Sequence, residues 1–158
     1  MNSRSPNALM TDLLAILKKP VAFFVYDRFT KHYSEKANTE LKKVLKANPH
    51  AKQAQKENSD VFKKRDLFVE KIDIHGLLLL IEHRWTEVFA NRYPEIMREA
   101  AASLLESRHQ VAHQKPLTIE DLQKVVQTAK ILLNKMKTTS AKNAIKKIRQ
   151  LLRHDYCY

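Results

Sequence analysis

The sequence predicts an all-α fold, and three observations lead to that prediction. The 158 residues include one glycine and five prolines, so residues that suit tight turns between strands are scarce. Helix-favouring leucine, lysine, alanine, glutamate and glutamine are abundant. Apolar residues recur every three or four positions through most of the chain, as in helices with one buried face. We expect one domain over residues 1–158: an up-and-down bundle of about five helices, with its core at about 20–136 and a basic C-terminal helix.

Two helices are predicted in the first third of the chain. Apolar residues at helical spacing predict a first helix over residues 7–18, which Pro20 ends or kinks because proline cannot donate a backbone hydrogen bond. A second, long amphipathic helix is predicted over residues 21–48. The break signal at Pro49 and the polar residues 52–58 that follow predict an exposed connection.

The buried centre of the bundle is predicted between residues 59 and 89. Ser59 or Asp60 is placed to cap a helix whose apolar residues lead into the run 77–81. Gly76 either interrupts this helix, because glycine is a poor helix former, or allows a second helix to approach closely, because glycine has no β-carbon.

Two further helices and a basic segment complete the predicted chain. A proline that is tolerated in a first helical turn opens a helix over residues 95–113, and Pro116 prevents its continuation. Residues 118–121 resemble a capping box, which starts the helix that closes the core. Residues 137–158 are predicted to form a basic amphipathic helix and a tail.

The charge of the chain favours a polyanionic partner. Lys plus Arg number 29 against 17 Asp plus Glu, a formal charge of +12. RNA is the partner we expect, although a solvated basic surface has the same composition. The terminal helix has a pattern that also suits an anionic membrane, a partner's groove or docking on its own bundle, but the absence of Trp and Phe from its apolar face argues against a membrane. The cations expected to contact RNA are Lys115, Lys142, Lys146, Lys147, Arg149 and Arg153.

A single cysteine, Cys157, excludes an intramolecular disulfide and a cysteine-based zinc site. This favours a reducing, cytoplasmic location. No charged-then-apolar leader opens the sequence, and its longest apolar run is far shorter than the roughly 18 residues of a membrane-spanning helix. We therefore expect a soluble protein without a membrane partner.

Residues 106–114 include the side chains best suited to chemistry. Arg108 and His113 lie five positions apart, with His109 between them. A guanidinium is always charged and forks onto two phosphate oxygens, whereas an imidazole exchanges a proton near neutral pH. On a straight helix five positions correspond to about 140° of rotation, so Arg108 and His113 need a distorted helix end or a second subunit to meet. An ordinary helix end, where cations are also favoured, is the alternative interpretation.

The segment Arg108-His109-Gln110-Val111-Ala112-His113 resembles the signature of the HEPN superfamily: an arginine, a polar residue, three variable residues and a histidine. Many members have Asn where this chain has His109. Residues 77–89 resemble the preceding helix of the Swt-type HEPN branch, and the resemblance spans about 23–136. It implies a HEPN-like bundle that forms a homodimer with a composite site. It also implies a metal-independent endoribonuclease of stress, toxin or antiviral defence, or else a non-catalytic RNA-binding or assembly module of a larger nuclease or helicase system.

The resemblance implies cleavage by the RNA's own 2′-hydroxyl. His113 would act as general base or acid, and Arg108 would stabilise the charge that develops on the phosphate. Nearness in the sequence suggests that His109 orients the phosphate or carries a second proton, and that Glu106 holds Arg108 or His109 in place. No cofactor is expected, and no metal, because no clustered carboxylates suggest a Mg²⁺ site. A neutralising protein is a further partner to expect in the toxin setting.

Two patterns have competing interpretations. His109 and His113 are four positions apart, as in paired helical zinc ligands, but no third ligand accompanies them, so exposed helical histidines are the preferred interpretation. Trp85, Phe89 and Tyr93 also step by four along one face. Packing in the core is preferred there over a platform on which bases stack.

Overall fold

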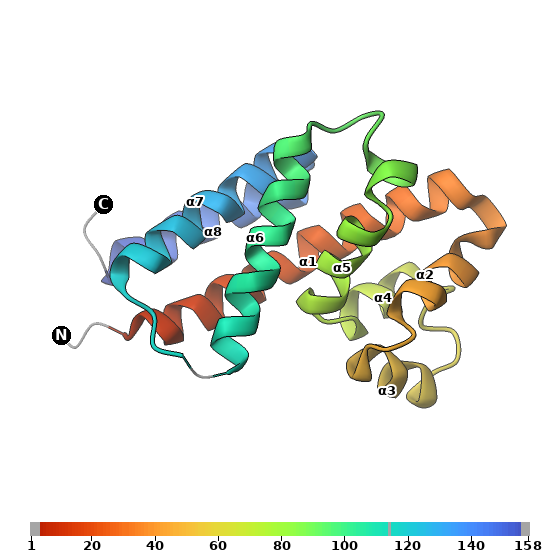
Figure 1. Ribbon diagram of the computed structural model, residues 1–158, viewed down its shortest axis with the longest axis horizontal. Coiled ribbons are helices and arrows are strands. Elements are labelled where there is room, and N and C mark those ends of the chain that lie inside the picture. Colours follow the sequence, from red (N-terminus) through yellow and green to blue (C-terminus); the bar gives the residue numbers. More distant parts are fainter. Residues whose placement is uncertain (1–3, 114, 156–158) are drawn as a thin grey trace.

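The computed structural model describes residues 4–113 and 115–155, and within these ranges it is helical and contains no strand. The prediction of an all-α bundle is confirmed (Figure 1). A 3₁₀ turn at Ser34–Lys36 and a π-helical turn at Trp85–Phe89 accompany the α-helices. These are α1 (Pro6–Tyr33), α2 (Ala37–Leu45), α3 (Pro49–Glu57), α4 (Arg65–Lys71), α5 (Ile74–His83), α6 (Glu95–Ala112), α7 (Ile119–Met136) and α8 (Thr139–Asp155).

Helix α1 is the long central element of the bundle. It runs the length of the molecule in Figure 1, with α7 and α8 beside one half and α2 and α4 beside the other. The prediction that Pro20 separates two helices was wrong, because α1 continues as one helix through this residue. Pro20 is buried, as are Leu17 and Val21 on either side of it. Burial of the surrounding apolar face offsets the backbone hydrogen bond that proline cannot make.

The predicted helix over residues 21–48 is two helices. The chain turns at Ser34, which has a positive φ of 54°, before α2 begins. Residues 49–57, predicted as an exposed connection, form α3 instead. Asn48 caps this helix by accepting a 2.9 Å hydrogen bond from the Ala51 amide, and Pro49 occupies the first turn. Asparagine followed by proline is a helix-start signal, so capping chemistry outweighed the polar composition.

The region predicted as one helix from Ser59 or Asp60 is also divided. Helix α4 begins only at Arg65, and the helical structure is interrupted again between the end of α4 at Lys71 and the start of α5 at Ile74. Asp73 caps α5 by accepting a 3.0 Å hydrogen bond from the Gly76 amide. A β-carbon on Gly76 would lie 3.3 Å from Cδ2 of Leu45. Glycine is therefore needed where α2 approaches the first turn of α5, as one of the two sequence interpretations expected.

An aromatic cluster fills the core beneath the π-helical turn. The Trp85 and Phe89 rings stack with centroids 5.8 Å apart, and Phe89 lies 5.7 Å from Phe24. Both Trp85 and Phe89 are buried, and Tyr93 meets Phe24 edge to face. The prediction that these aromatic residues pack in the core is confirmed.

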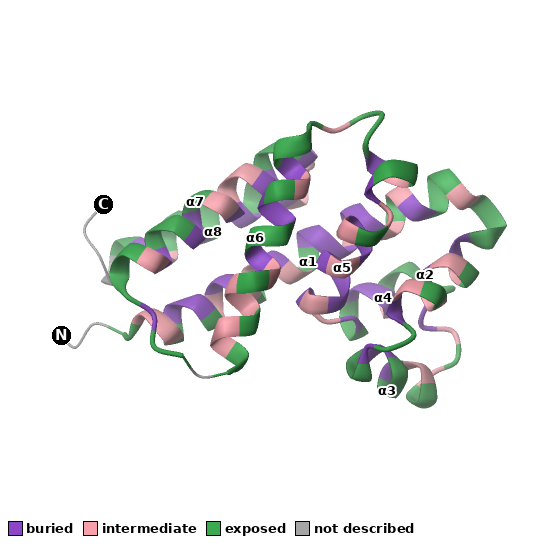
Figure 2. Cartoon of the chain, in the orientation of Figure 1, coloured by how far each residue is buried: buried purple, intermediate pink, exposed green. Residues whose placement is uncertain are grey.

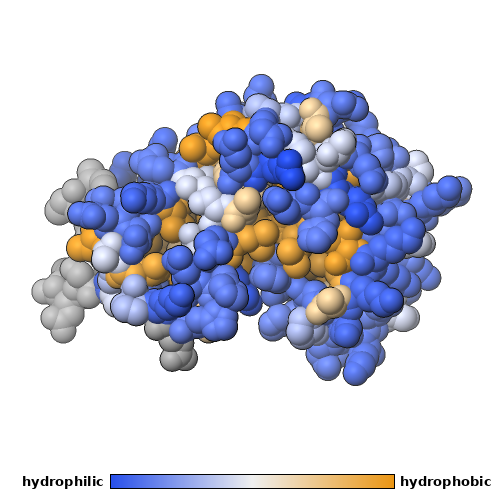
Figure 3. Space-filling view, viewed as in Figure 1, coloured by the Kyte–Doolittle hydropathy of each residue, from blue (hydrophilic) through white to orange (hydrophobic). Residues whose placement is uncertain are grey.

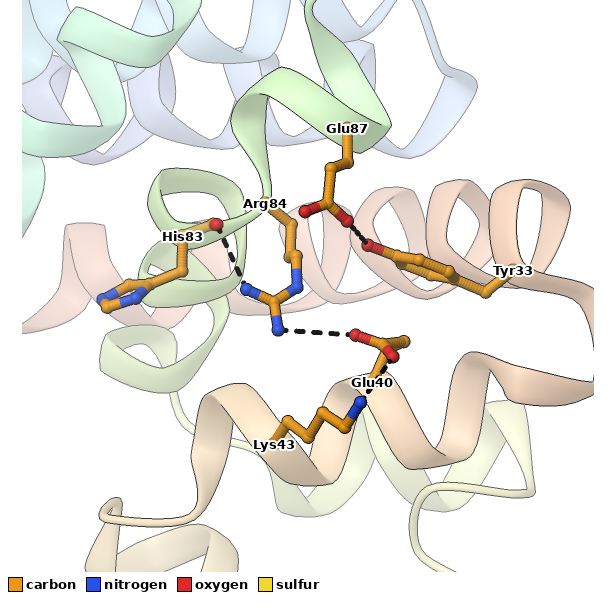
Figure 4. Close-up of polar contacts among 6 residues, drawn as sticks. All are labelled: Tyr33, Glu40, Lys43, His83, Arg84 and Glu87. Carbon is orange, nitrogen blue, oxygen red and sulfur yellow. Dashed lines mark hydrogen bonds and ion pairs between the residues drawn. The ribbon is translucent and has the colours of Figure 1, made fainter.

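A polar network holds the end of α5 against α1 and α2 (Figure 4). Arg84 donates 3.4 Å hydrogen bonds to the Glu40 carboxylate and the His83 carbonyl, and Lys43 lies 3.1 Å from the same glutamate. Tyr33 donates a hydrogen bond to Glu87. Burial, followed by this bond, raises the pKa of Tyr33. Arg84 is thus committed to structural contacts.

The C-terminal half follows the predicted boundaries closely. Helix α6 was expected at 95–113, and the capping box ahead of α7 is present, with 3.0 Å bonds in both directions between Thr118 and Asp121. Helix α8 packs on α1 and α7 with its apolar face inward and its cations exposed (Figure 2). One cluster of buried residues extends from Leu9 in α1 to Leu152 in α8, beyond the expected core at 20–136. No helix in the described ranges is long and apolar enough to cross a membrane.

Helix α6 leaves one apolar residue of its first turn in solvent. Ile96 is 43% exposed, whereas its neighbour Met97 is fully buried. Helix α6 presents Met97, Ala100, Ala101 and Leu104 to the core. Their spacing of three and four residues defines a face that excludes position 96.

We predict that Phe89→Ala lowers the free energy of unfolding by about 3–5 kcal/mol, the usual range for loss of a buried phenylalanine. Ile96→Ala, which removes an exposed side chain, should change it by about 0.5 kcal/mol or less. Urea unfolding followed by circular dichroism measures both. Equal destabilisation by the two substitutions would contradict this description of the core.

Candidate functional site

Arg108 on α6 faces the start of α5. Its Nη2 atom lies 3.9 Å from Oδ2 of Asp73, and the two side chains are 27% and 23% exposed. This separation is an ion pair but is too long for a hydrogen bond. Within the described residues the Arg108 side chain makes no hydrogen bond, in contrast to Arg84. Its donors are therefore available to a phosphate.

His75 lies beside this ion pair, in the first turn of α5. Its Nδ1 atom is buried and has no hydrogen-bond partner among the described residues. Burial lowers the pKa of His75, and the positive charge of Arg108 lowers it further, against the opposing effect of Asp73. His75 is therefore a neutral imidazole at pH 7, which is able to accept a proton.

A third element, α3, contributes His50. Its Nε2 atom lies 3.9 Å from Oδ2 of Asp73, and the side chain is exposed. His50, Asp73, His75 and Arg108 are called the Arg108 cluster below. Figure 3 shows a notch in the molecular surface between the end of α6 and the region of α3. The cluster thus joins residues of α3, α5 and α6.

Asp73, His75 and His50 were not among the site residues predicted from the sequence. Asp73 precedes an apolar helix and is a recognisable cap, but nothing in its spacing relates it to Arg108. His75 lies in an otherwise apolar stretch, where a polar side chain is a signal for a buried or functional role. Only tertiary packing reveals that these residues face Arg108.

His109 and His113 follow Arg108 at the C-terminal end of α6, and their side chains contact each other. Their rings meet edge to face with centroids 4.2 Å apart, and both side chains are exposed. The described residues include no contact between Arg108 and His113. Helix α6 continues through Ala112, so a distorted helix end does not bring the arginine and the histidine together within one chain. The other expected route, a second subunit, stays a prediction.

Glu106 is exposed on α6 and forms no ion pair with Arg108 or hydrogen bond with His109 in the described part of the chain. The carboxylate that faces Arg108 belongs to Asp73. Because Asp73 comes from another helix, it ties the position of Arg108 to the packing of α5 against α6.

The connection that follows His113 is anchored by Asn7 of α1. The Asn7 side chain donates a 3.0 Å hydrogen bond to the Lys115 carbonyl and accepts another from the Leu117 amide. Leu117 is buried, whereas the Lys115 side chain is exposed. Asn7, which is far from the motif in the sequence, thus fixes the position of the connection that follows the motif.

The predicted RNA-binding cations of α8 are exposed, but they are not brought to the Arg108 cluster by any contact in the described residues. They lie on a helix that packs on α1 and α7. Arg149 and Arg153 line a cavity of about 200 Å³ together with Lys130 of α7. The α8 cations predicted to contact RNA are Lys142, Lys146, Lys147, Arg149 and Arg153. They form a basic region separate from the Arg108 cluster.

The pairing of His109 with His113 lacks further metal ligands nearby. No group of three or more His, Cys, Asp or Glu side chains that would hold a metal ion occurs within the described ranges. Cys157 lies outside those ranges. The arrangement of these two imidazoles suits proton transfer or phosphate contact.

We predict that His75 makes the protein less stable as pH falls. Its pKa is depressed below 6.5 in the folded state, so between the folded pKa and 6.5 the unfolded chain binds more protons and stability rises with pH. Urea midpoints at pH 7.5 and 5.5 should differ less for His75→Gln than for the wild type. His83→Gln, which changes an exposed histidine at the other end of α5, should keep the wild-type difference. An unchanged difference in His75→Gln would contradict the assignment.

Comparison with known proteins adds one match. No curated protein and no solved structure matches the chain. The profile of the family described as Swt1-like HEPN matches residues 12–137. This match covers α6 with Arg108 and His113, the whole Arg108 cluster, and the helices that pack around it. The chain therefore belongs to the Swt1-like HEPN family.

Proposed function

We propose that the protein is a metal-independent endoribonuclease. One observation carries the proposal: Arg108 is half-buried, its side chain forms no hydrogen bond within the described residues, and it lies near the neutral imidazole of His75 on α5. Arg108 itself is on α6, the helix that leads to His109 and His113. A forked cation binds a phosphate, and imidazoles near neutrality move the protons that phosphodiester cleavage requires.

The chemistry uses a nucleophile that RNA itself supplies. The 2′-hydroxyl loses its proton to a histidine and attacks the adjacent phosphorus, while Arg108 stabilises the charge that develops on the phosphate oxygens. The bond from phosphorus to the 5′ oxygen breaks, and a second imidazole protonates that oxygen. The products are a 2′,3′-cyclic phosphate and a 5′-hydroxyl. DNA lacks the nucleophile and should not be cleaved.

We assign the proton transfers to His113 and His109, with His75 as a further imidazole close enough to Arg108 for that charge to lower its pKa. Arg108 and His113 are separate in a single chain, so we propose that two copies form a dimer in which both contribute to one cleft. The exposed positions of His109 and His113 suit contact with a second subunit. A setting in stress, toxin or antiviral defence, with a neutralising protein or a nuclease or helicase partner, is part of this proposal.

The second candidate function is a non-catalytic RNA-binding or assembly module. It is favoured by the same separation of Arg108 from His113 within the chain, which leaves the proton carrier away from the phosphate site unless a dimer forms. Under this alternative Arg108 holds RNA and no bond is broken.

We predict that Arg108→Ala and His113→Ala each lower the rate of RNA cleavage by roughly 10²- to 10⁴-fold, as expected for loss of a charge stabiliser or a proton carrier. The matched controls are Arg92→Ala and His83→Ala, which remove exposed side chains of the same types elsewhere. The assay uses single-stranded and structured RNA in excess chelator and identifies the 3′ ends of the fragments. Including His75→Ala distinguishes it from His113 as the proton acceptor.

Cyclic phosphate ends formed by the wild type and both controls, but not by Arg108→Ala or His113→Ala, are the expected result. Cleavage that is equal in all variants would contradict the proposal. RNA that remains intact but bound would favour the non-catalytic module instead. Circular dichroism of each variant verifies that the fold is retained.

A further inference from the structure

A lysine-rich depression lies between α2 and α3, apart from the residues that the sequence analysis selected. It has a volume of about 410 Å³. Leu45, Ala51 and Phe62 line it, and each of the three is only 2% exposed, so they form an apolar floor. The surrounding cations are Lys42, Lys43, Lys46 and Lys52. We call this depression the lysine groove.

Most of the charge in the lysine groove has no partner in the described structure. Lys43 pairs with Glu40 at 3.1 Å. Lys42, Lys46 and Lys52 form no ion pair or hydrogen bond through their side chains within the described ranges. Residues 36–57 contain six lysines and two glutamates, and no other acidic residue. Gathering like charges around one concavity raises its positive potential and attracts an anion.

Two observations place the groove near the Arg108 cluster. Ala51 and Lys52 in its lining directly follow His50, whose imidazole lies 3.9 Å from Asp73. Leu45 in its floor packs against the first turn of α5 at Gly76, close to His75. His50 and Lys52 are two positions apart on α3, about 200° around the helix, so a nucleotide chain that leaves Arg108 at His50 has to pass around α3 to reach the lysines.

We propose that the lysine groove binds the single-stranded RNA segment that flanks the phosphate held by Arg108. The groove supplies the two features such a strand requires: an apolar floor for a base and cations at the rim for the phosphates. This inference rests on the proposed function, because it takes the Arg108 cluster as the site of the central phosphate. It moves the main RNA contact from α8, where the sequence placed it, to α2 and α3.

The shape and the location of the groove favour RNA over other anionic partners. A membrane surface is contacted by a convex or flat apolar face flanked by cations, whereas here the apolar residues lie at the bottom of a concavity. An acidic protein segment would neutralise the lysines, but it does not contain the phosphate that Arg108 is proposed to bind. A polyanion with a regular phosphate spacing and flat apolar bases fits both features.

The test compares two triple variants with the same change in charge. One is Lys42→Gln, Lys46→Gln and Lys52→Gln in the groove, and the other is Lys142→Gln, Lys146→Gln and Lys147→Gln on α8. Binding of a single-stranded 2′-O-methyl RNA is measured over a series of salt concentrations. This oligonucleotide has no free 2′-hydroxyl, so binding is observed whether or not the protein cleaves RNA.

We expect the groove variant to lose affinity by at least about tenfold at low salt. The slope of log K against log salt should become shallower by about 2, since each phosphate contact on a single strand contributes roughly 0.7. The α8 variant should stay within about threefold of the wild type. Equal losses in both variants, or no loss in the groove variant, would overturn the proposal. Tighter binding of poly-glutamate than of RNA to the wild-type groove would overturn it as well.

The same experiment separates this inference from the proposed function. If the groove variant binds RNA weakly but the wild type cleaves no RNA, the groove proposal stands and the nuclease proposal falls. If the wild type cleaves and the groove variant binds normally, the groove proposal falls alone. Thermal unfolding of both triple variants confirms that each is folded.

Discussion

The burial of α1 is the constraint on which the rest of the structure depends. This helix packs against α2, α4, α5, α6, α7 and α8, and residues such as Leu17, Val25 and Phe29 are completely buried along it. Each buried side chain of this size contributes roughly 1.5–3 kcal/mol. Summed along α1, this term outweighs the local cost of Pro20, which would end an isolated helix. The arrangement of α5 and α6, and hence of the site, follows from their docking on α1.

The start of α5 holds the residues of the Arg108 cluster close to one another. Gly76 allows α2 to approach, and Asp73 caps the helix with one carboxylate oxygen while the other faces Arg108 and His50. Both partners of the Asp73–Arg108 pair are partly exposed, so solvent screening limits its contribution to at most about 1 kcal/mol. Under the proposed function, a phosphate with better geometry than the Asp73 carboxylate would displace it from Arg108.

The distribution of charge matters more for function than the total of +12. Arg84 and Arg65 are occupied by Glu40 and Asp27, with the Arg65–Asp27 pair joined by two hydrogen bonds. Lys43 pairs with Glu40, whereas Lys42, Lys46 and Lys52 in the lysine groove form no side-chain ion pair or hydrogen bond within the described ranges. The exposed cations of α8 lie on helices that do not supply the cluster. Under the proposed function, two basic regions of similar composition would therefore have different roles, a distinction that net charge does not contain.

The sequence by itself determined the features set by local chemistry. Helical periodicity and scarce glycine predicted the all-α class, the Thr118–Asp121 capping box located α7, and the pattern around Arg108 identified the helix with the motif. The Asn48-Pro49 signal that starts α3 was also present in the sequence, but the prediction of an exposed connection gave more weight to the polar composition of residues 52–58. Only the tertiary structure decided that α1 continues through Pro20 and that Asp73 and His75 face Arg108. Both depend on burial and on contacts between residues distant in the chain, which local periodicity cannot encode.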